Sequence, residues 1–162
     1  MIVKSIQDED YINFRIPSML IATPICSGKC WKELGLESSL CQNEALLKQK
    51  NIEINDYILC ERYLANDLTK AIVIAGLEPL DSLLDILDFI RILRENYQCL
   101  DPIVIYTGYK EDEVECKITE LAKMKNIIVK FGRYDPINFP ESIYDEVLGV
   151  KLATNNQYAK II

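Results

Sequence analysis

Three cysteines near the start of the chain are the residues best suited to chemistry. Cys26 and Cys30 lie one short spacer apart, and residues 31–40 separate them from Cys41. The chain contains no histidine, whereas structural zinc sites and most iron–sulfur clusters take four protein ligands. Three thiolates on a four-iron cluster leave one iron open to another ligand. This set of residues therefore favours a chemical site over a purely structural one.

The cysteine segment resembles the cluster loop of radical S-adenosylmethionine (SAM) enzymes. The likeness lies in the Cys26–Cys30 pair after a predicted strand and in the Gln42-Asn43 that follows Cys41. More narrowly, it is similar to the short activating proteins of anaerobic ribonucleoside-triphosphate reductase. The family's usual spacing is C-x3-C-x2-C, so residues 31–40 are an insertion.

Four further segments follow in the family's order, and the resemblance covers nearly the whole chain from about Ser18. They are 75–80 (Ala-Gly-Leu-Glu-Pro-Leu), similar to the GGEP motif; 106–109 (Tyr-Thr-Gly-Tyr), similar to a strand end of the activating proteins; 131–134 (Phe-Gly-Arg-Tyr), similar to their Asp-Gly-x-Phe turn; and 152–157 (Leu-Ala-Thr-Asn-Asn-Gln), similar to their terminal Ser-x-Asn-Gln segment.

The resemblance implies a [4Fe-4S] cluster on Cys26, Cys30 and Cys41, with SAM on the open iron. The residues expected to bind SAM lie in the motifs or at a strand end: Gly76, Glu78, Pro79, Thr107, Lys130, Arg133 and Asn156. The reduced cluster would cleave SAM to a 5′-deoxyadenosyl radical, with no catalytic residue beyond the cluster. A reduced flavodoxin or ferredoxin would donate the electron, and a glycyl-radical enzyme would be the protein substrate.

Other interpretations stay open. The three thiols suit a non-catalytic iron–sulfur protein that transfers electrons or senses redox state. They also suit a structural zinc site completed by a carboxylate or by Cys60. Gly76 and Pro79 can form an ordinary turn between a strand and a helix. Free cysteines elsewhere pack as small apolar side chains.

Composition excludes several classes. The 162 residues carry a net charge of −7 without a basic cluster, so we expect no nucleic-acid partner. No apolar run reaches membrane-spanning length, and the N-terminus lacks the apolar core of a signal peptide. We therefore expect one cytoplasmic domain over residues 1–162 with reduced cysteines. Without histidine, neither a Ser-His-Asp triad nor a Cys-His pair is available.

Strands and helices alternate along the chain. We expect strands at 18–25, 70–75, 102–107 and 126–130, and helices from 55 or 56 to 66, from 81 or 82 to 97, and at 111–124, the last with a Glu113–Lys117 pair on its surface. This order predicts an α/β fold: a partial (β/α) barrel or an open, mainly parallel sheet of the radical SAM type. Ligands of such sheets bind at the carboxyl ends of the strands, where all the motif segments fall.

Overall fold

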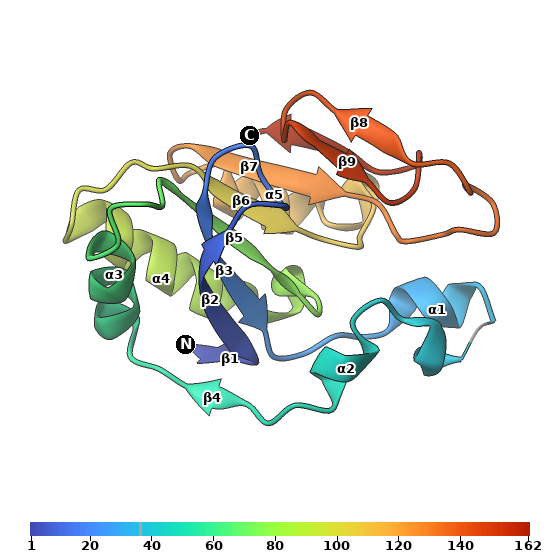
Figure 1. Ribbon diagram of the computed structural model, residues 1–162, viewed down its shortest axis with the longest axis horizontal. Helices are drawn as coiled ribbons and strands as arrows, with labels where there is room; N and C mark the ends of the chain where they lie inside the picture. The colour runs from blue at the N-terminus through green and yellow to red at the C-terminus, as the bar shows by residue number, and fades with distance from the viewer. Residues whose placement is uncertain (36) are drawn as a thin grey trace.

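Six strands form an open, mainly parallel sheet in the computed structural model, which describes residues 1–35 and 37–162 (Figure 1). Their order is β10-β7-β6-β5-β3-β2; the four inner strands run parallel, and β2 and β10 pair antiparallel at the two edges. The sheet therefore does not close into a barrel within the described residues. The strands are β1 (Ile2–Val3), β2 (Ser5–Asp10), β3 (Ser18–Thr23), β4 (Ile52–Glu53), β5 (Ala71–Gly76), β6 (Ile103–Tyr106), β7 (Ile127–Phe131), β8 (Ile143–Asp145), β9 (Val150–Leu152) and β10 (Tyr158–Ile161).

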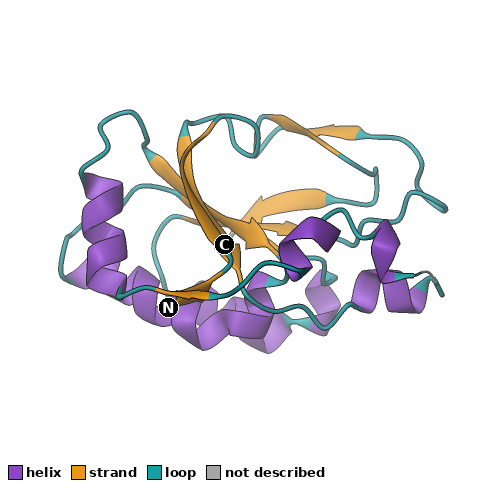
Figure 2. Cartoon of the chain, turned by 60° about the horizontal axis from the view of Figure 1, so that its bottom comes forward, coloured by secondary structure: helices purple, strands orange, loops and turns teal. Residues whose placement is uncertain are grey.

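The helices that connect the parallel strands lie on one side of the sheet (Figure 2). This placement follows from right-handed crossovers between strands that are neighbours both in sequence and in the sheet. None of the helices in the described ranges has the length and apolar composition needed to cross a bilayer. The α-helices are α1 (Lys29–Glu33), α2 (Glu44–Leu47), α3 (Asp56–Leu64), α4 (Leu83–Glu95) and α5 (Glu115–Leu121), and 3₁₀ turns lie at η1 (Ser38–Leu40), η2 (Pro79–Ser82) and η3 (Glu111–Glu113).

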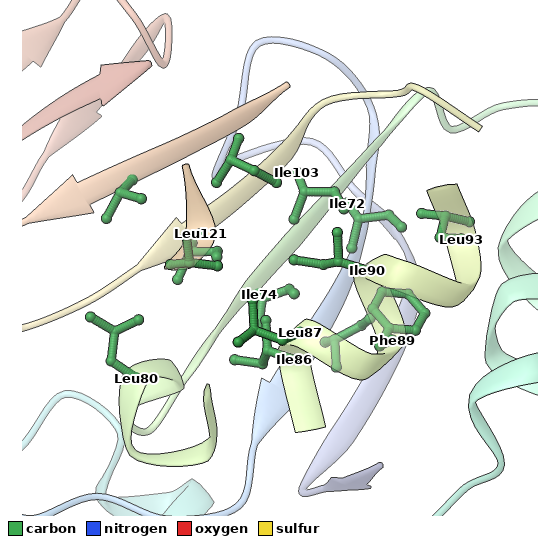
Figure 3. Close-up of a cluster of buried hydrophobic side chains, with 14 of the residues drawn as sticks. Ile72, Ile74, Leu80, Ile86, Leu87, Phe89, Ile90, Leu93, Ile103 and Leu121 are labelled. Carbon is green, nitrogen blue, oxygen red and sulfur yellow. The ribbon is translucent and has the colours of Figure 1, made fainter. Parts of the chain in front are cut away.

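The side chains of alternate residues in each parallel strand point to opposite faces of the sheet. On β5, Ile72 and Ile74 point to the helices, and Ala71, Val73 and Ala75 lie on the other face. The helix side forms the main core, in which side chains of α4 pack on the isoleucines of the sheet (Figure 3). The opposite face carries a smaller core beneath the β8–β9 hairpin. The long apolar runs of the sequence thus form strands that are covered on both faces.

The predicted strands are confirmed with end shifts of a few residues at most, and the mainly parallel sheet is confirmed with them. The helix predicted from 55 or 56 is present as α3, and Asn55 caps it, because the Asn55 side chain accepts a hydrogen bond from the Tyr57 N–H. The antiparallel strands β2 and β10 were not predicted. β2 reads Ser-Ile-Gln-Asp-Glu-Asp, and its polar composition hides an edge strand from any search for apolar runs.

The helix predicted at 111–124 is broken, and its predicted surface pair is wrong. A 3₁₀ turn, η3, occupies its start, and α5 begins only at Glu115. Glu113 binds Lys29 and Arg133 instead of Lys117. Lys117 donates to the Leu80 carbonyl oxygen at 2.6 Å. Partners that are distant in sequence therefore replace the local pair.

Candidate functional site

A cavity of about 800 Å³ opens at the carboxyl ends of the parallel strands. Its floor is the helix-free face of the sheet, where Leu20, Ala22 and Ala75 present small or medium side chains. The cysteine-bearing segment closes one side of it. Among the predicted site residues, the cavity is lined by Cys26, Cys30, Cys41, Gly76, Glu78, Thr107 and Lys130. Segments from four parts of the sequence thus meet where the fold class predicts a ligand.

The three cysteines reach the cavity from a loop with little regular structure. Cys26 follows β3, Cys30 lies in the short helix α1, and Cys41 directly follows the turn η1. The Cys26 sulfur accepts the Gly28 N–H at 3.2 Å, and the Cys41 sulfur accepts the Asn43 N–H at 3.4 Å. Burial raises the pKa of Cys26 to about 11, and burial also raises the pKa of Cys30. In the ligand-free protein these two thiols are therefore protonated at neutral pH.

Glu78 is a buried carboxylate that ties two strand ends together. It accepts hydrogen bonds from the Thr107 hydroxyl at 2.7 Å and from the Gly108 N–H at 2.8 Å, both beyond β6, and from the Leu80 N–H at 3.1 Å. Burial raises its pKa, and these three donors oppose that shift. Its own N–H donates to the Ile25 carbonyl oxygen beside Cys26. Glu78 therefore holds the turn after β5, the end of β6 and the start of the cysteine loop in register.

Gly76 and Pro79 shape the turn that positions Glu78. Gly76 has φ +89°, and a Cβ there would lie 2.8 Å from the Ala22 Cβ on the neighbouring strand. Only glycine combines this backbone conformation with such a close approach. The Gly76 carbonyl oxygen accepts the Asn43 side-chain N–H at 2.5 Å, so the turn is also joined to the cysteine segment. Pro79 is buried at the first position of η2 and does not line the cavity.

Lys130 lies on the cavity wall beside Tyr106, its register partner on β6. Its ammonium lies 5.9 Å from the centre of the Tyr106 ring and donates to the Gly132 carbonyl oxygen at 2.9 Å. Burial lowers the pKa of Lys130 to about 8, and the negative charge of Glu78 opposes that shift. The side chain is therefore cationic at neutral pH, and it faces the same space as the cysteines.

Arg133 and Asn156 lie in a neighbouring cavity of about 630 Å³, which shares Leu34 and Gly132 with the first. The Arg133 guanidinium is buried and pairs with Glu113 at 2.7 Å and with Glu33 at 2.8 Å. The Asn156 side-chain N–H donates to the Arg133 carbonyl oxygen at 2.9 Å. The sequence analysis placed both residues among those expected to bind SAM, and the structure puts them in the neighbouring cavity instead.

The cysteines match an iron–sulfur cluster in the type of donor and in environment. All three line one cavity, two of their sulfurs accept backbone N–H groups, and no histidine competes with them. Such N–H···S contacts surround protein-bound clusters. Within residues 1–35 and 37–162, however, no three cysteine or carboxylate side chains are close enough together to hold a metal ion. Convergence of the three sulfurs stays a prediction.

Cys60 lies elsewhere. It is buried in the helix-side core on α3 and does not line the cavity. The packing role that its apolar surroundings favoured is confirmed. A zinc site that combines Cys60 with the three cavity cysteines would need the chain to rearrange.

Sequence reasoning named Asn43 and Tyr106 only as parts of motif segments and did not assign either to the site. Asn43 joins the cysteine segment to Gly76, and its position just after Cys41 was the available signal. Tyr106 forms part of the floor, and its hydroxyl donates to the Asn13 carbonyl oxygen. Alternation along the predicted strand 102–107 would have placed Tyr106 on the same face as Val104.

Comparison with models of known protein families, with curated proteins and with solved structures gave no match.

Proposed function

We propose that this protein is a radical SAM iron–sulfur enzyme, with a [4Fe-4S] cluster on Cys26, Cys30 and Cys41. One observation carries the proposal: the cysteines, the turn after β5, the end of β6 and Lys130 line a single cavity at the strand ends. The one-sided helices and the sequential strand order support a partial barrel of the radical SAM type. When bound and reduced, such a cluster supplies the electron that cleaves SAM to methionine and a 5′-deoxyadenosyl radical.

The chain's own residues would bind and orient the ligand. Gly76 lets the turn pass close to β3 and leaves the cavity wall free of a side chain. Both carboxylate oxygens of Glu78 accept hydrogen bonds from N–H and O–H donors. We therefore assign Glu78 a structural role in the cavity wall rather than a role in proton transfer. Thr107 receives the Tyr109 N–H on its hydroxyl oxygen and thereby fixes the loop beyond β6. The protein thus supplies position and shelter from water.

The size of the cavity favours this function over electron transfer alone. About 800 Å³ is typical of a site for a drug-sized ligand. A protein that only carries electrons needs no such space beside its cluster. The volume therefore supports a second, organic ligand next to the cysteines.

We further propose a protein substrate, a glycyl-radical enzyme such as an anaerobic ribonucleotide reductase, with reduced flavodoxin or ferredoxin as electron donor. Ile12 and Ile137 both line the cavity and are mostly exposed, at 77% and 62%. Exposed apolar side chains at a cavity mouth suit contact with another protein. Reduced thiols of this kind fit the cytoplasm, the compartment that we propose.

The test is anaerobic reconstitution with iron and sulfide, followed by dithionite and SAM. We expect about four irons and four sulfides per chain, and 5′-deoxyadenosine as a product. Zinc in the anaerobically purified protein, without sulfide, would replace this proposal with a structural zinc site. Iron and sulfide without SAM cleavage would favour the electron-transfer or redox-sensing alternative.

Transfer of the radical is tested separately. Mixing the reduced protein and SAM with an anaerobic ribonucleotide reductase should give the doublet electron-paramagnetic-resonance signal of a glycyl radical. If SAM is cleaved and no glycyl-radical enzyme acquires this signal, the choice of partner is wrong and the SAM chemistry stands.

A further inference from the structure

The loop between Cys26 and Cys30 is held by an aspartate and a tyrosine that come from two other turns. The Ser27 N–H donates to one carboxylate oxygen of Asp81 at 2.8 Å. The Tyr109 hydroxyl donates to the other oxygen at 2.7 Å and lies 3.2 Å from the Ser27 hydroxyl. Asp81 belongs to η2 after β5, and Tyr109 lies beyond the end of β6. These three residues form a closed set of hydrogen bonds beside the cysteine segment.

Asp81 is not required to cap its own turn. Glu78 already caps η2, because its side chain accepts the Leu80 N–H at 3.1 Å. Both carboxylate oxygens of Asp81 instead accept donors from outside η2. Hydrogen bonds to a carboxylate are stronger than those to a neutral acceptor. Asp81 therefore fastens a segment other than its own.

Tyr109 is a fixed anchor for this contact. Its N–H donates to the Thr107 hydroxyl oxygen at 3.0 Å, and its carbonyl oxygen accepts the Gly132 N–H at 3.0 Å. The centre of its ring lies 5.2 Å from the ammonium of Lys29 and 5.4 Å from that of Lys117. Lys29 belongs to the cysteine loop itself, so Tyr109 contacts this loop through both its hydroxyl and its ring.

The position of Ser27 affects the sulfur of Cys26, the residue directly before it. The Ser27 carbonyl oxygen accepts the Lys32 ammonium at 2.6 Å, so both polar groups of its backbone are engaged. Next in the chain, the Gly28 N–H donates to the Cys26 sulfur at 3.2 Å. Gly28 has φ +71°, and a Cβ there would lie 2.6 Å from the Trp31 ring, so this turn has little freedom. Movement of Ser27 would therefore take the Gly28 N–H away from the sulfur.

Apolar packing does not fix the shape of this loop. Ser27 is exposed, and none of the residues of α1, the helix that carries Cys30, is buried. The hydrogen bonds to Asp81 and Tyr109 must therefore supply much of its order. In metal sites, hydrogen-bonded groups behind the ligands commonly set how the ligands are oriented.

We propose that Asp81 and Tyr109 are positioning residues, which hold the Cys26–Cys30 loop in the shape that presents its thiols to a metal. The proposal deepens the proposed function and rests on it only in taking Cys26 and Cys30 as ligands. Neither Asp81 nor Tyr109 is among the described residues that line the cavity. Both act on the thiols through the backbone of Ser27.

The first experiment measures amide hydrogen exchange in the reduced, metal-free protein by nuclear magnetic resonance. The variants are Asp81→Ala and Tyr109→Phe, and the control is Asp88→Asn, which removes an exposed carboxylate of α4. We expect the Ser27 amide to exchange at least about tenfold faster in Asp81→Ala, because its charged acceptor is lost, and to change less in Tyr109→Phe. The amides of β5 should exchange as in wild type, which separates loss of loop order from loss of the fold. Unchanged exchange of the Ser27 amide in Asp81→Ala would overturn the proposal.

The second experiment measures the affinity of the same proteins for cobalt(II), followed by thiolate-to-cobalt absorption under anaerobic conditions. Asp81→Ala should bind cobalt at least about tenfold more weakly than wild type, since its loop must be ordered on binding. Asp81→Asn keeps an acceptor oxygen and should recover part of this loss. Asp88→Asn and Ser27→Ala, which keeps the backbone N–H, should bind cobalt as wild type does.

The two proposals fail in different ways in this titration. Equal cobalt affinity of wild type and Asp81→Ala would refute the positioning role alone. A wild-type protein that shows no thiolate-to-cobalt absorption would refute the metal site itself, and with it both the proposed function and the positioning role.

Discussion

The two faces of the sheet use the same strands in different ways. On the helix side, isoleucine, valine and phenylalanine side chains of β5, β6 and β7 are fully buried against α4 and its neighbours. On the other face, the same strands change toward their carboxyl ends from valine and isoleucine to alanine, tyrosine and lysine. The first face is packed, and the second leaves a cavity. Neighbouring residues of one strand thus line a packed core on one face and a cavity on the other.

The sulfur atoms divide in the same manner. Cys60 is enclosed by the helix-side core, whereas Cys26, Cys30 and Cys41 face the cavity from an irregular loop. A thiol inside a packed core fills space as a small apolar side chain. A partly exposed thiol beside a cation can instead bind a metal. The environment, more than the residue type, separates the two groups.

The largest expected effect tests the difference between the cavity cysteines and Cys60. Replacing Cys26, Cys30 or Cys41 by alanine should remove essentially all iron and sulfide from the reconstituted protein, because two thiolates do not hold the cluster. Cys60→Ala, the matched variant on the packed face, should keep the full content. Iron and sulfide analysis per chain decides it; iron retained in Cys41→Ala and lost in Cys60→Ala would show that the third ligand is misassigned.

Next in size is a test of packing on the two faces. Phe89→Ala should lower the free energy of unfolding by about 3–5 kcal/mol, because Phe89 is fully buried in the helix-side core. Leu20→Ala, on the cavity floor, should cost only about 1 kcal/mol, since its side chain is partly exposed. Urea unfolding of the ligand-free protein measures both. Equal losses would mean that the cavity face is as tightly packed as the core.

The pH dependence of the free energy of unfolding tests whether Lys130, on the cavity face, is buried as a cation. Its pKa is about 8 in the folded protein against 10.5 in the unfolded chain, so the unfolded state binds more protons between these values. Stability contributed by this site therefore rises with pH from about 8 to 10.5, and the cost of the buried charge is fully present below pH 8. Lys130→Met lacks this cost and should be more stable than wild type by up to about 3 kcal/mol at pH 7.

The readout is the difference between the two unfolding free energies at several pH values in ligand-free protein. Glu78, Cys30 and Tyr106 face Lys130 and are present in both proteins, so their own titration largely cancels. A difference that does not shrink above pH 8 would show that Lys130 is not buried as a cation.

The smallest expected effect compares two glycines. Gly76 and Gly35 both have positive φ, but a Cβ at Gly76 would press on Ala22, whereas a Cβ at Gly35 would have no atom of the described residues within 4 Å, its chain neighbours aside. Gly35→Ala should cost about 1 kcal/mol of backbone strain, and Gly76→Ala about 2 kcal/mol more. Equal losses of unfolding free energy in urea would show that β3 and the turn after β5 do not approach each other closely.

The parallel sheet was predictable because apolar runs such as residues 71–75 are long enough to identify strands without help from the rest of the chain. The meeting of Cys26, Gly76 and Thr107 was predictable for a related reason, since parallel strands bring their carboxyl ends to one edge. The ion pairs of Arg133 were not predictable. Its partners Glu33 and Glu113 lie 100 and 20 residues away in sequence. No spacing rule connects them, and only the folded chain shows that the charge is already paired.

Several antiparallel strands escaped prediction for another reason. β2 alternates polar residues with few apolar ones, and β8 and β9 have three residues each. Short or polar strands gain their stability from the sheet that they join, so their own sequence carries little signal.

The attachment of helix α1, which carries Cys30, has a consequence for how the protein responds to electrolyte. None of the helix residues is buried, and ion pairs join it to the rest of the chain: Glu33 with Arg133, and Lys29 with Glu113. Apolar packing is indifferent to moderate salt, whereas partly exposed ion pairs are screened by it. Helix α1 is therefore fastened by contacts that ionic strength can loosen, and added salt should weaken its attachment while the hydrogen bonds of Ile25 and Asn43 and the sheet beneath stay in place.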